Sequence, residues 1–86
     1  MASSEDFLRK ILTGGSDANI RFSELVLLLR ELGFDERIRG SHHIFTRRGV
    51  IEILNLQPNR AMAKPYQVRQ VRSVIIRYAL QEELDA

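Results

Sequence analysis

The chain of 86 residues contains no cysteine, so disulfide bonds and thiolate metal sites are excluded and packing alone must hold the fold. The absence of cysteine also fits a reducing cytoplasm. No apolar run approaches the roughly 18 residues of a membrane-spanning helix. The first residues lack the basic segment, followed by an apolar one, that marks an export signal. We therefore expect a soluble cytoplasmic protein without a membrane span.

Acidic residues are scarce in the second half of the chain. Between Arg37 and Tyr78 there are nine basic residues and one acidic residue, whereas Met1 to Glu36 holds four basic and seven acidic residues. The formal net charge of +2 hides this asymmetry. The electrostatic field of such a positively charged segment attracts phosphate backbones, and it makes the binding of nucleic acid depend on salt. The second half is therefore predicted to bind a polyanion.

The first helix is predicted over Ser3–Thr13, where apolar residues recur at helical spacing. Ser3 and Asp6 resemble a capping pair, and Gly14 and Gly15 end the pattern. The polar residues that follow are expected to form a linker. We expect the helix to pack against the core or a second subunit through four apolar side chains: Phe7, Leu8, Ile11 and Leu12.

A second helix is predicted from Ser23 to the residue before Gly33. Ser23 is a suitable N-cap, and Phe22 and Leu27 are placed to form a hydrophobic staple around it. Gly33 is expected just past the last turn, in the left-handed conformation that closes many helices. The apolar face of this helix is predicted to consist of Leu25, Val26, Leu28, Leu29 and Leu32.

The hydrophobic period changes to two after the second helix, which is typical of strands. We predict three short strands, at Phe34–Arg39, His42–Arg47 and Val50–Leu56. The turns between them contain Gly40 and Gly49. Connections this short require the strands to run antiparallel.

A last helix is expected to begin at Pro65 and to run to about Glu83, because proline is suited to the first helical position. Its buried stripe is predicted to be Val68, Val71, Ile75, Tyr78 and Ala79. On its basic side Arg69, Arg72 and Arg77 are expected to face solvent or a ligand.

The predicted fold class is α+β, with a helix, a three-stranded antiparallel sheet and a helix, preceded by an additional N-terminal helix. The helices should cover one face of the sheet and leave the other face open. We assign residues 1–19 to an N-terminal helical extension with its linker. Residues 20–86 form the main unit of what we expect to be one compact domain.

The segment Arg37–Arg48 gathers both histidines of the chain among four arginines. Histidine, with an unperturbed pKa of about 6.5, exchanges protons near neutrality. Because adjacent strand residues point to opposite faces, His42 and His43 cannot easily bind one metal ion, and Glu52 is the only acid nearby. We therefore predict no metal and no cofactor. Ser41 has no acidic partner that would complete a hydrolase triad with His42.

One exposed histidine among arginines suits cleavage of RNA by the 2′-hydroxyl next to the scissile phosphate. That reaction needs a general acid or base and cations that stabilise charge on the phosphate oxygens. We expect His42 to face the open side of the sheet, together with Ile44, and His43 and Phe45 to face the helices. The alternative is that His42 only donates a hydrogen bond at a turn of a solvated strand.

Six residues are predicted to bind RNA phosphates around His42. Arginine and lysine side chains supply charge-assisted hydrogen bonds to phosphate oxygens, and a serine hydroxyl adds a neutral one. These residues are Arg37, Arg39, Ser41, Arg47, Arg48 and Lys64.

The hexapeptide GSHHIF, residues 40–45, resembles the G-[ST]-H-x-x-[FYW] signature of the HicA, or YcfA-like, toxins of bacterial and archaeal toxin–antitoxin systems. The segments 53–57 and 63–69 lie where such toxins have their third strand and final helix, so the resemblance covers residues 20 to about 80. It implies a fold like a double-stranded-RNA-binding domain and metal-independent endonucleolytic cleavage of mRNA with His42 as the catalytic residue. It also implies inhibition by a HicB-type antitoxin. The N-terminal helix departs from the family's minimal pattern.

Two other classes of protein fit the same residues. One is an RNA-binding module without catalytic activity, and the other is a protein-interaction domain whose basic face meets an acidic partner. A binder of double-stranded DNA is less well supported because the chain has no helix-turn-helix signal.

Overall fold

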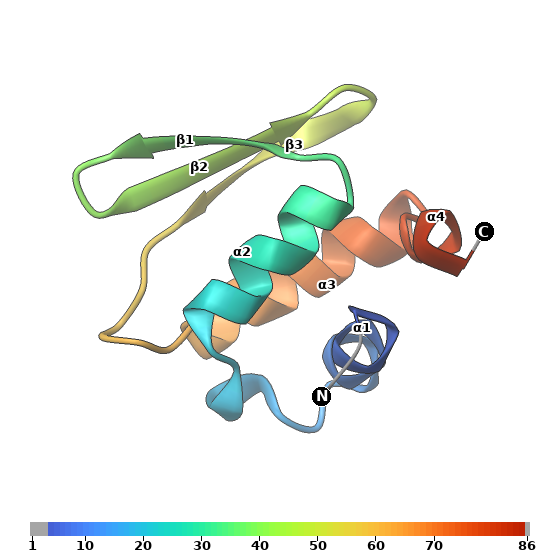
Figure 1. Ribbon diagram of the computed structural model, residues 1–86, viewed down its shortest axis with the longest axis horizontal. Helices are drawn as coiled ribbons and strands as arrows, with labels where there is room; N and C mark the ends of the chain where they lie inside the picture. The colour runs from blue at the N-terminus through green and yellow to red at the C-terminus, as the bar shows by residue number, and fades with distance from the viewer. Residues whose placement is uncertain (1–3, 86) are drawn as a thin grey trace.

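The computed structural model describes residues 4–85, and it is an α+β fold with a three-stranded sheet on one side and the helices on the other (Figure 1). The predicted α+β class and the three antiparallel strands are confirmed. Ser3, the first member of the predicted capping pair, lies outside the described residues. The elements in chain order are α1 Ser4–Thr13, the 3₁₀ turn η1 Asp17–Asn19, α2 Phe22–Glu31, β1 Asp35–Arg39, β2 His42–Arg47, β3 Val50–Leu56, α3 Pro65–Arg77 and α4 Gln81–Asp85.

The sheet has the order β1-β2-β3, with antiparallel pairing throughout. In the first pair Arg39 lies opposite His42 and Glu36 lies opposite Phe45. In the second pair the register shifts between Phe45 and Arg47. After the shift, each β2 residue lies opposite a β3 residue two positions away from the one that the earlier register would give. Because side chains alternate with period two, every side chain stays on its original face.

The end of α2 follows the prediction. Gly33 has a φ of +88°, and its N–H donates to the carbonyl of Arg30 at 3.0 Å. The N–H of Phe34 donates to the carbonyl of Leu29, also at 3.0 Å. These two bonds satisfy carbonyls that would otherwise lack partners at the helix end. They also explain why β1 begins at Asp35, one residue later than predicted.

The predicted start of α2 is wrong. The helix begins at Phe22 with Arg21 as its N-cap, and no side chain makes a capping hydrogen bond. The N–H of Phe22 instead donates to the carbonyl of Ala61 at 3.0 Å. A backbone carbonyl from a distant part of the chain therefore accepts the first N–H of the helix, and Ser23 is not its N-cap. Leu27 is 56% exposed, so it does not form the predicted staple.

The last helix is shorter than predicted, because α3 ends at Arg77 and a separate helix, α4, follows. Ala79 takes a left-handed φ of +52°, and the N–H of Leu80 donates to the carbonyl of Ile75 at 3.0 Å. A left-handed alanine costs about 1–2 kcal/mol. The turn buries Leu80 to 2% exposure, which is worth about 1.5–3 kcal/mol. Burial of one leucine therefore offsets the cost of the break.

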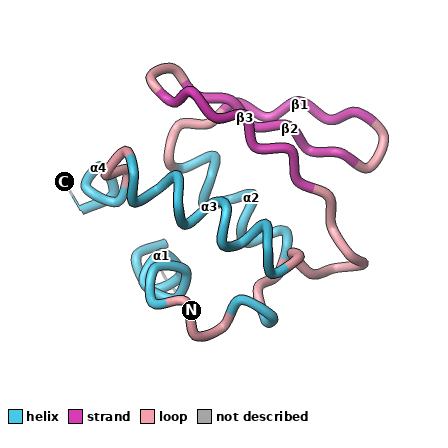
Figure 2. The backbone as a smooth tube through the Cα atoms, turned by 180° about the vertical axis from the view of Figure 1, so that it is seen from behind, coloured by secondary structure: helices cyan, strands magenta, loops and turns pink. Residues whose placement is uncertain are grey.

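The core fills the space between the inner face of the sheet and the helices, and it continues beneath α2 and α3 to α1. Both views place α1 on the far side of α2 and α3 from the sheet (Figures 1 and 2). Three of its four predicted apolar residues, Phe7, Leu8 and Ile11, are buried, and Leu12 is partly buried against them. The N-terminal helix therefore packs against the core of its own chain.

Arg72 is not left to solvent as predicted. Its guanidinium donates to the carbonyl of Ile11 at 3.0 Å and to both carboxylate oxygens of Asp17, at 2.8 and 2.9 Å. A Cβ at Gly14 would lie 3.3 Å from this guanidinium, so a residue without a side chain suits the turn. The hydrogen bond from Arg72 holds the pKa of Asp17 below its usual value. One arginine of α3 thus ties α1 and η1 to the main unit.

The Asp17–Arg72 ion pair should make stability depend on pH. Because the pKa of Asp17 is lowered in the folded state, the stabilisation is complete above the unfolded pKa and disappears as the pH falls through the folded pKa. Asp17→Asn should cost about 1–3 kcal/mol of unfolding free energy at about pH 7 and almost nothing at about pH 2. Urea unfolding at several pH values measures this difference. A cost that stays constant with pH would contradict the assignment to an ion pair.

Candidate active site

The two histidines lie on opposite faces of β2, as predicted. His42 is exposed on the outer face, while the His43 side chain is only 22% exposed and Phe45 is fully buried against the helices. Ile44 shares the outer face with His42. The helices of the described chain all lie on the other side of the sheet, so a ligand can approach this face (Figure 2).

The imidazole of His42 is held by a residue that the sequence analysis missed. Its Nδ1 lies 3.0 Å from Oδ1 of Asn55 on β3. An amide oxygen only accepts hydrogen bonds, so Nδ1 donates, and in the neutral ring Nε2 carries the lone pair. The signal for Asn55 was a polar residue, poorly suited to strands, within the apolar β3 sequence. No hydrogen bond engages Nε2 of His42 among the residues that the structure describes, so this nitrogen can exchange a proton.

Two arginines of β1 stand on the same face as His42. Arg39 is its direct cross-strand partner, and Arg37 lies opposite Ile44 in the next row. The Cβ atoms of such partners are about 5 Å apart. Both guanidinium groups are exposed, and neither has a carboxylate partner among residues 4–84. They border a shallow hollow of about 420 Å³ on the outer face, which Ile53 also lines.

Ser41 lies in the turn between β1 and β2, at the same end of the sheet as His42. Its hydroxyl accepts a hydrogen bond from Nε2 of Gln57 at 2.7 Å. The bond links the turn to the end of β3. Because a hydroxyl also donates, Ser41 keeps a proton for a second acceptor such as a phosphate oxygen.

Arg47 is directed away from His42. Its guanidinium donates to the carboxylate of Glu83 in α4 at 2.6 Å, and a Cβ added at Gly33 would lie 3.3 Å from its Nε. Both partners belong to the helical side of the sheet. The structure therefore assigns Arg47 to the attachment of α4 and places it apart from the groups around His42.

The remaining two predicted phosphate-binding residues also lie elsewhere. Arg48 belongs to the turn after β2, whereas His42 begins that strand. Lys64 precedes α3 and borders a separate hollow with Ala18 and Asn59. Only the two β1 arginines and Ser41 are therefore grouped with His42.

Glu52, the only acidic residue between Arg37 and Tyr78, makes its hydrogen bonds on the helical side of the sheet. The hydroxyl of Tyr78 donates to its Oε1 at 2.6 Å, and Arg77 donates to Oε2 at 3.1 Å. The hydrogen bond from Tyr78 contributes most to a lowered pKa of Glu52. The carboxylate thus holds α3 against β3 and adds no negative charge beside His42.

Within the described part of the chain, no group of three or more histidine, aspartate or glutamate side chains is arranged to hold a metal ion. In the same residues no helix has the length and apolar character needed to cross a membrane.

Comparisons with protein-family models, with curated proteins and with solved structures gave no match.

Proposed function

We propose that this protein is a metal-independent endoribonuclease that cleaves mRNA, with His42 as its general acid and base. The observation that carries the proposal is an exposed imidazole fixed through Nδ1 by Asn55, with Arg39 directly opposite on the neighbouring strand. Together with the GSHHIF hexapeptide, this geometry supports a toxin of the HicA type, with a fold like a double-stranded-RNA-binding domain and a HicB-type antitoxin as partner.

The reaction follows from what the site offers. Nε2 of His42 accepts the proton of a ribose 2′-hydroxyl, and the 2′-oxygen forms a bond to the adjacent phosphorus. The bond from phosphorus to the 5′-oxygen breaks, and that oxygen takes a proton from water or from the imidazolium. Arg39 and Arg37 stabilise the negative charge that builds up on the phosphate oxygens. The products are a 2′,3′-cyclic phosphate end and a 5′-hydroxyl end.

A protein-interaction role is the second candidate, because the outer face also exposes apolar side chains. Ile51 is 89% exposed and Ile53 is 62% exposed, both on β3. Apolar surface beside a basic patch is typical of a protein-binding site. An inhibitory protein that covers His42 would bury these residues, so the two roles are compatible on one face.

Incubation of the purified protein with a defined single-stranded RNA in the presence of EDTA tests the proposal. We expect fragments that carry 2′,3′-cyclic phosphate or 3′-phosphate ends and 5′-hydroxyl ends. A substrate with 2′-deoxyribose at the scissile position is the matched control, and it should remain intact. RNA that is bound but never shortened would instead assign the chain to the non-catalytic RNA-binding modules.

The salt dependence of RNA binding tests the placement of the cations. In a His42→Ala background, which prevents cleavage, the paired changes Arg37→Ala and Arg39→Ala should reduce the slope of log K against log salt by about 1.4. The pair Arg48→Ala and Lys64→Ala removes the same charge elsewhere and should change the slope far less. Equal slopes for both double variants would contradict the outer-face interface.

A further inference from the structure

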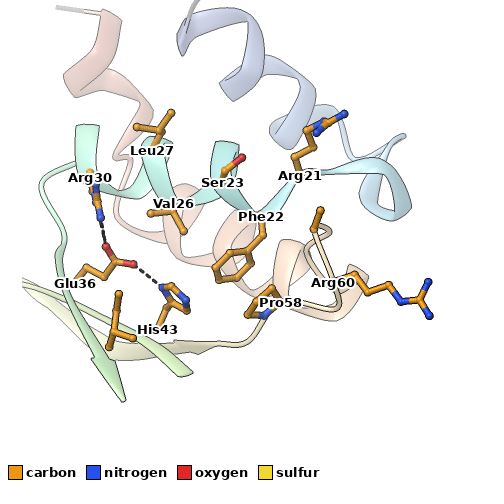
Figure 3. A pocket seen from close by; sticks show the side chains of 12 residues that line it. Arg21, Phe22, Ser23, Val26, Leu27, Arg30, Glu36, His43, Pro58 and Arg60 are labelled. Atoms are coloured by element: carbon orange, nitrogen blue, oxygen red, sulfur yellow. Dashed lines mark hydrogen bonds and ion pairs between the residues drawn. The ribbon is translucent and has the colours of Figure 1, made fainter. Parts of the chain in front are cut away.

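A second hollow opens on the helical side of the sheet, between α2, β1 and the loop after β3 (Figure 3). Its volume is about 490 Å³, within the range of small-molecule sites. His43 lines it, whereas His42 is on the opposite face of the same strand. The cleft is therefore separate from the candidate active site.

The middle of the cleft is apolar. Phe22 and Val26 from α2 and Pro58 from the loop line it. Two further lining residues, Leu27 of α2 and Ile38 of β1, are 56% and 57% exposed. Large aliphatic side chains that are exposed on two sides of the same hollow favour a ligand with a flat apolar part.

One end of the cleft is closed by a hydrogen-bonded group. The Glu36 side chain is only 7% exposed, and it accepts from Nε of Arg30 at 3.1 Å and from Nδ1 of His43 at 2.7 Å. Burial acts to raise the pKa of Glu36, but these hydrogen bonds outweigh it and hold the pKa below its usual value. The ionised carboxylate therefore accepts a hydrogen bond from the Nδ1–H of His43.

This arrangement leaves Nε2 of His43 available in a fixed position. The ring also packs edge-on against Phe22, with 4.8 Å between the ring centroids. No hydrogen bond engages Nε2 within the described residues. A ligand in the cleft can therefore place a polar ring edge against one oriented imidazole nitrogen.

Two exposed arginines, Arg21 and Arg60, stand at the opposite rim of the cleft, with side chains that extend outward from it in different directions (Figure 3). Neither has a carboxylate partner in the part of the chain that the structure describes. Arg60 also has a φ of +58°, in a tight turn closed by mutual backbone hydrogen bonds of Asn59 and Met62, at 2.9 and 3.1 Å. Glycine takes this conformation without steric cost and arginine does not, so the residue at this position is better suited to binding than to the turn.

We propose that this cleft binds a nucleoside monophosphate group, with its base against the apolar walls and Nε2 of His43, and its phosphate on Arg21 and Arg60. Three arginines and one glutamate give the lining a charge of +2, because Arg30 also contributes. A phosphate monoester carries about −1.5 to −2 near neutral pH, so the charges match. The group can belong to a free mononucleotide or to the phosphorylated end of an RNA strand. The proposal does not depend on the nuclease activity, since none of its residues lies on the outer face.

Binding is tested by calorimetry and by amide chemical shifts of the full chain, with AMP, GMP, CMP and UMP as probes. We expect at least one mononucleotide to shift the signals of Phe22, His43 and Arg60. The matching nucleoside and inorganic phosphate should each bind at least tenfold more weakly. If none of the four mononucleotides moves these signals, the proposal is overturned.

Arg60→Gly separates a binding role from a structural one. It should lower mononucleotide affinity at least tenfold while leaving the melting temperature equal or higher, because glycine relieves the turn. Arg48→Gly removes an arginine from another turn and should leave affinity unchanged. Unchanged affinity in Arg60→Gly would contradict the proposal.

The source of the group is decided with His42→Ala protein, which keeps RNA intact. Short RNAs with and without a 5′-phosphate are compared with the free mononucleotide. Preference for the phosphorylated RNA identifies a strand end, and preference for the free mononucleotide identifies a small-molecule ligand. If His42→Ala retains mononucleotide binding while wild-type protein fails to cleave RNA, the nuclease proposal fails and the cleft proposal stands.

Discussion

Replacing His42 with alanine should lower the rate of RNA cleavage by about 10²- to 10⁴-fold, the range that one general acid or base supplies. The side chain is exposed on the outer face and contributes no packing, so the fold should be preserved. Rates on a labelled RNA, together with a circular dichroism melt, measure both effects. A folded His42→Ala protein that cleaves as fast as the wild type would remove His42 from the mechanism.

Asn55→Asp provides a sharper control for the same site. Oδ1 of Asn55 lies 3.0 Å from Nδ1 of His42, and a carboxylate there stabilises the protonated imidazole. The pH above which His42 acts as a base should therefore rise, and the pH–rate profile should move to higher pH. A profile that does not move would show that the ionisation of His42 does not set the rate.

Deleting Met1–Gly15 should lower the melting temperature by more than 10 °C or abolish folding. The deletion removes three buried side chains, Phe7, Leu8 and Ile11, each worth about 1.5–3 kcal/mol before ordering entropy. Small domains are stable by only about 5–15 kcal/mol, and in this size range 1 kcal/mol corresponds to about 4–8 °C. Where the shortened chain still folds at low temperature, it should keep its cleavage activity, because α1 supplies no group to the outer face.

Point substitutions make the test independent of the deletion. Ile11 is fully buried, so Ile11→Ala should cost about 2–5 kcal/mol, whereas Arg9→Ala on the exposed side of α1 should change stability by less than about 0.5 kcal/mol. Sedimentation and cleavage assays on the deletion variant test whether α1 acts instead as a lid or as an oligomerisation arm. Unchanged stability with faster cleavage would make α1 a lid, and a dimer that becomes a monomer would make it an oligomerisation arm.

The sequence by itself predicted the features that are stabilised by residues close together in the chain. Gly33 ends α2 because the left-handed conformation is cheapest for glycine, whatever lies nearby. The period of two predicted all three strands, and it also placed His42 and His43 on opposite faces. Even the register shift beside Phe45 leaves this result unchanged, because it moves the partner by two residues.

Tertiary structure alone decided the features that join distant parts of the chain. The carbonyl that starts α2 belongs to Ala61, and the oxygen that orients His42 belongs to Asn55. Arg47 was predicted to bind phosphate and Arg72 to face solvent or a ligand, yet both are held by carboxylates 36 and 55 residues away. An arginine has the same local pattern whether its partner is an RNA phosphate or a glutamate. Periodicity and capping report interactions within about four residues, whereas these partners meet only when the packed core fixes which surfaces face one another.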